Sequence, residues 1–208
     1  MPKLCLSQDP DADQLLSQNP LALLIGLVLD QQIPLERAFA APLELQRRLT
    51  QPLTARLIAD MDPGALTEAF TARPALHRFP ASMAQRVQAL CEVVLTAYDG
   101  NAEDLWRTAP SGHELLARVN ALPGFGEQKA RIFVAFVGKQ LGVTPAGWMD
   151  ASEPFGKPGT HQSIADIVDA DSLDRVRLFK KAMKAAGKPE QTREAARSSS
   201  SKPAEHCQ

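Results

Sequence analysis

Hydrophobic and polar positions along the chain recur with the spacing of helices. The run Leu21 to Leu29 is apolar on every side, which predicts a central, buried helix. Asn19-Pro20 precedes it, and a capping residue followed by proline is typical of a helix start. Pro34 to Leu49 and the segment from Ser82 to Ala97 have amphipathic patterns. No segment has the sustained alternation of a strand, so the pattern predicts an all-α protein.

The remaining segments fit the same class, and we expect about ten helices in all. We expect these helices to form two lobes within residues 1–187. One lobe consists of the middle helices at about 35–115, and the other consists of both termini together with the helical hairpin described below. Residues 188–208 are polar and serine-rich, which predicts a disordered tail. The other predicted helices are Leu53 to Met61, Gly64 to Thr71, a short one from Asn101, Gly112 to Asn120, one after Gly126, Ser163 to Val168 and Ser172 to Ala186, with Thr144 to Pro158 irregular.

The segment Leu122-Pro123-Gly124-Phe125-Gly126, here called the hairpin turn, separates two of these helices. Pro123 cannot continue the preceding helix, and Gly124 and Gly126 leave backbone N–H groups uncovered. Such a turn at a helix N-terminus favours an anion: a nucleotide, a phosphorylated metabolite or a nucleic-acid backbone. The dinucleotide loop needs a preceding strand and the triphosphate loop needs a Gly-Lys-Ser/Thr ending, and this sequence has neither.

The composition of the chain limits how it can bind a partner and where in the cell it is expected. The chain has 208 residues and a net charge of −1, so any contact with DNA must be local rather than a bulk electrostatic attraction. Cys5, Cys91 and Cys207 are scattered, without metal-ligand or disulfide spacing, as expected in a reducing compartment. No signal-peptide pattern is visible, and the apolar run from Leu21 is too short to span a bilayer. We therefore expect a cytoplasmic protein.

Two further groups of residues are candidates for a functional site. Gln31 and Gln32 come where the apolar helix ends, so they either reach a cleft or merely cap the helix end. Asp150 follows Trp148 and Met149 in the segment after the second hairpin helix. It is a candidate catalytic carboxylate, or else a capping or surface residue of an irregular loop.

The glutamine pair, the hairpin turn and Asp150, in that order, resemble the helix-hairpin-helix (HhH-GPD) base-excision DNA glycosylase superfamily, relatives of endonuclease III. The resemblance covers roughly Asn19 to Ala186. It implies a two-lobed HhH-GPD fold and a monomer that acts on duplex DNA containing a damaged base. It also implies DNA contacts and a structural Na⁺ or K⁺ ion at the carbonyls of the hairpin turn. The implied DNA contacts are Gln31, Gln32, Leu122, Gly124, Phe125, Gly126, Gln128 and Lys129, and the carbonyls are those of Leu122 and Phe125.

The resemblance also implies the chemistry. The damaged nucleotide leaves the duplex, and Asp150 stabilises positive charge on the sugar and activates a water molecule. Trp148 and Met149 are candidates for the base pocket. Members that nick the strand carry a lysine two residues after the second glycine, where this chain has Gln128. Lys129 is one residue later, about 100° around the helix. We therefore predict a monofunctional glycosylase, or a bifunctional glycosylase/lyase if Lys129 takes the nucleophile position.

Other features of the family are missing. The four-cysteine motif is absent, so we predict no iron–sulfur cluster and no cofactor. The expected lesion is an alkylated purine, with uracil second. The alternatives are a catalytically inactive DNA-binding protein and a helical protein whose hairpin turn contacts another protein. A late basic cluster is either a solvated helix face or a phosphate contact; its members are Arg175, Arg177, Lys180, Lys181, Lys184 and Lys188.

Overall fold

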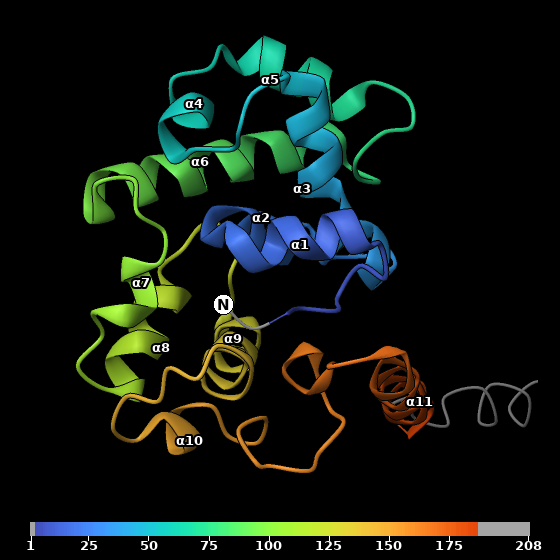
Figure 1. Cartoon of the computed structure of the whole chain (residues 1–208), viewed down its shortest axis with the longest axis vertical. Helices are drawn as coiled ribbons and strands as arrows, with labels where there is room; N and C mark the ends of the chain where they lie inside the picture. Colours follow the sequence, from blue (N-terminus) through green and yellow to red (C-terminus); the bar gives the residue numbers. More distant parts are fainter. Residues whose placement is uncertain (1–2, 187–208) are drawn as a thin grey trace, which may run out of the picture.

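The computed structural model describes residues 3–186, and the predicted tail lies outside them. Within this range the chain forms eleven α-helices and one 3-10 helix and no strand, which confirms the all-α class (Figure 1). The helices are α1 (Pro10–Gln18), α2 (Pro20–Leu29), α3 (Leu35–Leu49), α4 (Ala55–Ala59), α5 (Pro63–Thr71), α6 (Pro80–Tyr98), α7 (Asp104–Arg107), α8 (Gly112–Asn120), α9 (Glu127–Gln140), α10 (Trp148–Ala151), η1 (Ile164–Asp166) and α11 (Ala170–Ala186).

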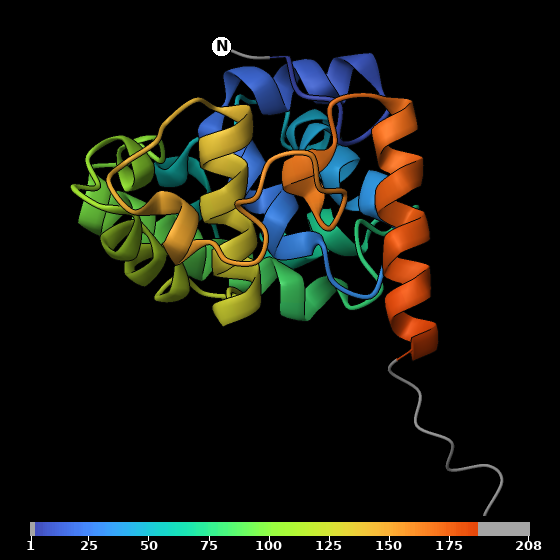
Figure 2. The same cartoon turned by 90° about the horizontal axis from the view of Figure 1, so that it is seen from below.

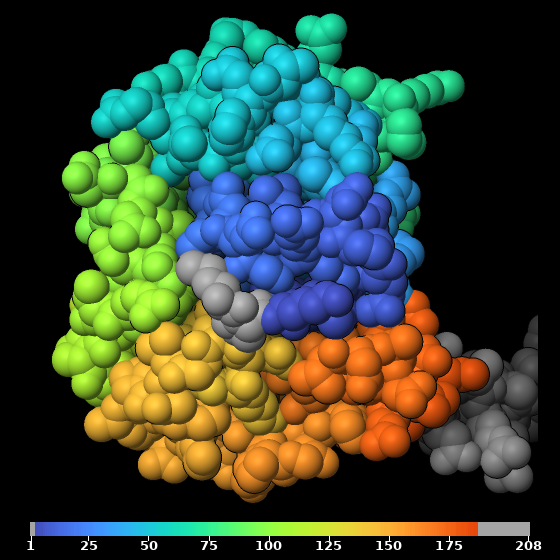
Figure 3. Space-filling model, viewed as in Figure 1, coloured from blue at the N-terminus to red at the C-terminus, as the bar shows by residue number. Residues whose placement is uncertain are grey.

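Helix α2 is the centre of the core, as its sequence predicts. Asn19 caps it by accepting hydrogen bonds from two backbone N–H groups of the first turn, at 3.0 and 3.2 Å. Every residue from Leu21 to Leu29 is buried. Gly26 lets α3 approach closely, because a Cβ at that position would lie 2.7 Å from the ring of Phe39. In Figure 3, α1 and α2 occupy the middle of the molecule, between the α3–α5 segment and the α9–α11 segment.

Helices α3 to α6 pack beside α2 and account for most of the predicted middle lobe. The long helix α6 lies against α4 and α5. Thr54 and Asp62 cap the two short helices, each through a hydrogen bond to a backbone N–H of the first turn. Buried side chains from α1 through α11 form one continuous cluster, so both predicted lobes share a core. The division into two lobes remains a prediction.

The hairpin helices α8 and α9 pack on each other, and α10 and η1 pack against α9. In the perpendicular view of Figure 2, α10 lies on one side of α9, and η1 and α11 lie on the other. Helix α10 falls inside the segment predicted to be irregular, and α1 was not predicted as a separate helix. The predicted helix from Ser163 is the single 3-10 turn η1, which begins with a capping box between Ser163 and Asp166.

None of the described helices alone is long and apolar enough to cross a membrane. Helices α1 and α2 together have the length and apolar composition of a membrane span, but they are bent by 117° at their junction.

Candidate functional site: a cavity beside the hairpin turn

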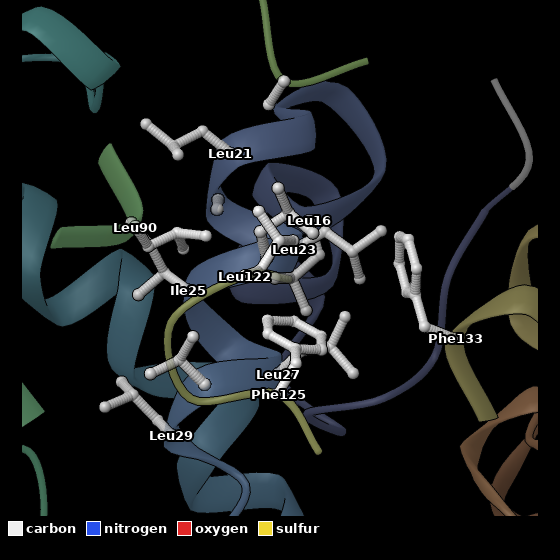
Figure 4. Close-up of a cluster of buried hydrophobic side chains, with 14 of the residues drawn as sticks. Leu16, Leu21, Leu23, Ile25, Leu27, Leu29, Leu90, Leu122, Phe125 and Phe133 are labelled. Atoms are coloured by element: carbon white, nitrogen blue, oxygen red, sulfur yellow. The ribbon is translucent and has the colours of Figure 1, made fainter. Parts of the chain in front are cut away.

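The hairpin turn is anchored by its two large side chains. Leu122 and Phe125 are 3% and 8% exposed, and they point among the α2 side chains Leu23 and Leu27 (Figure 4). The Phe125 N–H donates to the Leu122 carbonyl at 3.1 Å, which closes the turn. Gly124 has a φ of +84°, a conformation that side chains other than glycine rarely adopt. The predicted roles of Leu122 and Phe125 as DNA contacts are thus confined to their backbone groups, and the predicted cation at their carbonyls remains a prediction.

Gln31 is held beside this turn. Its side chain donates from Nε2 to the Val28 carbonyl at 2.7 Å and accepts from Arg86 Nη1 at 3.1 Å. The same arginine packs against the hairpin turn, because a Cβ built on Gly124 would lie 3.9 Å from Arg86 Cδ. Arg86 therefore joins the glutamine to the hairpin turn. Gln32 is exposed and has a φ of +56°.

A cavity of about 470 Å³ brings most of the predicted DNA contacts together. It lies where the end of α2, the start of α9 and the η1–α11 segment meet. A larger, mainly apolar cavity of about 750 Å³ lies next to it, and the two share the lining residues Glu127, Gln128, Ile132 and Lys180. The smaller cavity is lined by Leu27, Asp30, Gln31, Gly124, Gly126, Glu127, Gln128, Lys129, Ile132, Ser163, Ile164 and Lys180.

Asp30 and Lys129 are the ionisable pair of this cavity. Burial raises the pKa of the Asp30 carboxyl, although the nearby charges of Lys180 and Lys129 act in the opposite direction. Burial lowers the pKa of Lys129 to about 8, against the opposing effect of Asp30 and with a smaller lowering contribution from Arg86. Lys129 Nζ also donates to the Leu27 carbonyl at 2.7 Å. Shifted titration of this kind is frequent among groups that act in catalysis.

The predicted catalytic residue Asp150 does not line this cavity. It is exposed on α10, a four-residue helix that packs on α8 and α9. Trp148 fixes the position of α10: a Cβ at Gly138, near the end of α9, would meet its ring at 2.4 Å. Gly138 is eleven residues after the start of α9, roughly 16 Å along the helix axis. Asp150 is therefore not among the residues that line the cavity beside the hairpin turn.

The two predicted base-pocket residues lie with Asp150. Trp148 is half-buried against α9 and against Gly112 at the start of α8, and Met149 is 51% exposed. Neither lines the cavity beside the hairpin turn. The contact with Gly112 is close, because a Cβ there would lie 2.3 Å from Trp148 Cα. These positions give Trp148 a packing function between α8, α9 and α10.

Sequence reasoning assigned no role to Asp30 and Arg86, and it placed Lys180 in a basic cluster that is either a solvated helix face or a phosphate contact. Asp30 had a detectable signal, because a carboxylate directly after nine apolar residues stands at the edge of the core. Arg86 had none, because it is a single basic residue on the long helix α6. Among residues 3–186, no group of His, Cys, Asp and Glu side chains could hold a metal ion.

Comparison of the chain with protein-family models, curated proteins and solved structures finds no match.

Proposed function

We propose that this protein is a DNA glycosylase of helix-hairpin-helix type, which extrudes a damaged base from duplex DNA and hydrolyses its N-glycosidic bond. The observation that carries the proposal is that Asp30, Gln31 and the hairpin glycines line one cavity. Base excision needs a backbone clamp, a side chain that occupies the vacated position in the duplex, and a charge that stabilises the reacting sugar. The hairpin glycines match the clamp, Gln31 matches the side chain that fills the vacated position, and Asp30 matches the stabilising charge.

The clamp is the hairpin turn with the first turn of α9. Its free N–H groups and the positive end of the helix dipole favour a DNA phosphate. No side chain caps α9, so these N–H groups are available to a ligand. Gln128 and Lys129 follow directly, and Gln31 lines the same cavity.

Asp30 replaces Asp150 in the proposed chemistry. Loss of the base leaves positive charge on the sugar, which a carboxylate in the cavity stabilises. Water forms a bond to C1′ as the bond from C1′ to the base nitrogen breaks, and Asp30 accepts the proton of that water. The raised pKa of Asp30 makes it a stronger base than an exposed aspartate. We expect the protein to work as a monomer, without a cofactor, and we retain an alkylated purine as the first substrate and uracil as the second.

A specific observation favours a second candidate, a glycosylase/lyase that uses Lys129. With a pKa of about 8, about a tenth of the amine is uncharged at pH 7, a far larger share than for an ordinary lysine, and this share can act as a nucleophile. The nitrogen would bond to C1′ as the base leaves with its electron pair, and opening of the sugar ring would give an imine. Borohydride reduces such an imine to a permanent bond between protein and DNA.

The test is a panel of duplexes, each carrying one alkylated purine, uracil or another damaged base. Free base is measured, and strand breaks are scored before and after alkali. The proposal predicts release of at least one base with strand breaks only after alkali. A borohydride-trapped adduct that Lys129→Gln abolishes would establish the second candidate. DNA binding without release of any base would instead identify a non-catalytic DNA-binding protein.

A further inference from the structure

A further cavity, of about 250 Å³, lies at the other end of α2 from the hairpin turn and is called here the rear cavity. It is enclosed by the α1–α2 junction, α7 and the segment that follows α9. The hairpin turn approaches Val28 near the end of α2, whereas Pro20 and Leu23 near the start of α2 line the rear cavity. It shares no lining residue with the cavity beside the hairpin turn. The rear cavity is therefore separate from the proposed DNA site.

Two changes of chain direction shape the rear cavity. Helices α1 and α2 are bent by 117° at their junction, where Asn19 caps α2, and residues on both sides of the bend line the cavity. Gly142, with a φ of +69°, follows the end of α9 and turns the chain, so that its two neighbours line the cavity as well. The apolar lining residues are Leu16, Pro20, Leu23, Trp106, Leu141 and Val143.

The polar side chains of the wall, apart from Trp106, are satisfied within the protein. Ser17 Oγ donates to the Asp13 carbonyl at 2.6 Å and accepts from the Leu4 N–H at 3.0 Å. Glu103 and Arg107 form an ion pair at 2.6 Å, so their charges cancel. A charged ligand would lose its hydration here without gaining an unpaired counter-charge. The rear cavity therefore suits a neutral ligand.

Trp106 leaves one donor for such a ligand. The residue is 2% exposed, and its ring is fixed by an edge-to-face contact with Phe133, with the ring centres 5.6 Å apart. Its indole N–H donates to no acceptor among residues 3–186. A tryptophan buried to this extent usually has a hydrogen-bond partner for its N–H. Because Trp106 lines the rear cavity, an acceptor on a ligand can supply that partner.

The volume and the ring of Trp106 define the ligand further. An apolar cavity of about 150 Å³ in another protein binds benzene. At about 250 Å³ the rear cavity has room for two fused rings. An aromatic ligand also gains a favourable ring–ring contact with Trp106, in addition to the burial of its apolar surface.

We propose that the rear cavity is a binding site for a small, neutral aromatic molecule of one or two rings that carries a hydrogen-bond acceptor. The rings lie in the apolar cavity beside Trp106, and the acceptor takes the indole N–H. The inference goes beyond the proposed function, because it depends neither on DNA binding nor on base excision.

The test uses quinoline, which has two rings and one acceptor nitrogen, and naphthalene, which has the two rings alone. The chain has two tryptophans, Trp106 and Trp148, so a proton–nitrogen correlation spectrum has two indole N–H signals, and Trp148→Phe identifies them. Quinoline should move the Trp106 indole proton downfield, because a hydrogen bond deshields it, and should leave the Trp148 signal in place. Naphthalene should not move the Trp106 proton downfield.

Trp106→Phe separates the hydrogen bond from the apolar contact. This variant keeps a ring but has no N–H. The affinity for each probe is measured from the shifts of backbone amides. The ratio of quinoline affinity to naphthalene affinity should fall about two- to tenfold relative to wild type, because a hydrogen bond contributes about 0.5–1.5 kcal/mol and 1.4 kcal/mol is a factor of ten.

A second variant, Val143→Phe, adds a ring at the wall of the rear cavity and should abolish quinoline binding. Its matched control is Val168→Phe, at a position that is 58% exposed, which should bind quinoline like the wild type. The inference is overturned if quinoline leaves the Trp106 signal unchanged or moves both indole signals equally. An unchanged affinity ratio in Trp106→Phe, or wild-type binding by Val143→Phe, would also overturn it.

Discussion

The ammonium group of Lys129, in the first turn of α9, donates a 2.7 Å hydrogen bond to the carbonyl of Leu27, in the last turn of α2. The two residues are 102 positions apart. The bond ties the start of the second hairpin helix to the end of the buried helix, where Asp30 follows. It also places an amine in a partly desolvated cavity, and this burial lowers its pKa.

The titration of Lys129 can be measured directly. Its pKa of about 8 should give half-maximal labelling by acetic anhydride near pH 8, followed by mass spectrometry of the peptides. A free lysine derivative labelled in parallel is the reference, with its midpoint near the usual value of about 10.4. Asp30→Asn should lower the Lys129 midpoint further, because it removes a negative charge that favours the ammonium form. Equal midpoints for Lys129 and the free lysine derivative would contradict this description of the cavity.

Asp30→Asn should stabilise the protein at neutral pH. Burial raises the pKa of Asp30, so the native state carries a desolvated carboxylate above that pKa, and its stability falls as pH rises through the folded pKa. The amide removes this cost, and we expect a gain of about 0.5–2 kcal/mol in the free energy of unfolding at pH 7.

The gain should shrink as pH falls towards about 4, because the wild-type carboxyl is then neutral as well. Urea unfolding at several pH values measures the effect. Asp150→Asn is the control and should change stability little, since Asp150 is exposed. A variant Asp30→Asn that is less stable than the wild type at every pH would disprove the assignment of desolvation as the dominant cause.

Gly124 and Gly126 should respond differently to alanine. Gly124 has a φ of +84° and its Cβ would lie 3.4 Å from Val28, so Gly124→Ala should lower stability by about 1–2 kcal/mol. Gly126 has a φ of −112° and nothing within 4 Å of a built Cβ, so Gly126→Ala should fold with nearly unchanged stability. Thermal unfolding distinguishes them, and equal losses would show that the turn geometry is not the cause.

Gly138→Ala tests the separation between α10 and the site. The added methyl would meet the Trp148 ring at 2.4 Å, and overpacking of this kind costs about 1–3 kcal/mol. The cavity beside the hairpin turn lies at the other end of α9, so DNA affinity per folded molecule should stay within about twofold of wild type. Urea unfolding and fluorescence anisotropy give the two quantities. A large loss of DNA affinity would place the site nearer to α10 than we propose.

The sequence was most informative where local chemistry decides structure. The cap Asn19, Pro20 and the all-apolar run define α2, and proline with two glycines defines the hairpin turn. It was least informative where tertiary contacts decide. The short helix α10 forms because Trp148 packs into the space left by Gly112 and Gly138, which are distant in sequence. The position of Asp150 follows from that packing, and order along the chain cannot show it.

The register of Lys129 is a second example. Counting around an ideal helix turns Lys129 away from the place of a nucleophilic lysine. Nevertheless its long side chain reaches the Leu27 carbonyl and lines the cavity. Its destination depends on the approach of α2, which no local pattern encodes. The DNA contacts predicted at Gln31, Gly124, Gly126 and Gln128 do meet in the cavity, but their binding of DNA remains a prediction.

The most direct test of the central claim is single-turnover release of base from the best duplex of the panel by three proteins. The claim is that the carboxylate beside the hairpin turn, and not the one on α10, supports excision. We predict that wild type and Asp150→Asn release the base at the same rate within about twofold, and that Asp30→Asn is slowed by at least about 100-fold while still binding the duplex. Full activity of Asp30→Asn, or loss of activity in Asp150→Asn, would contradict it.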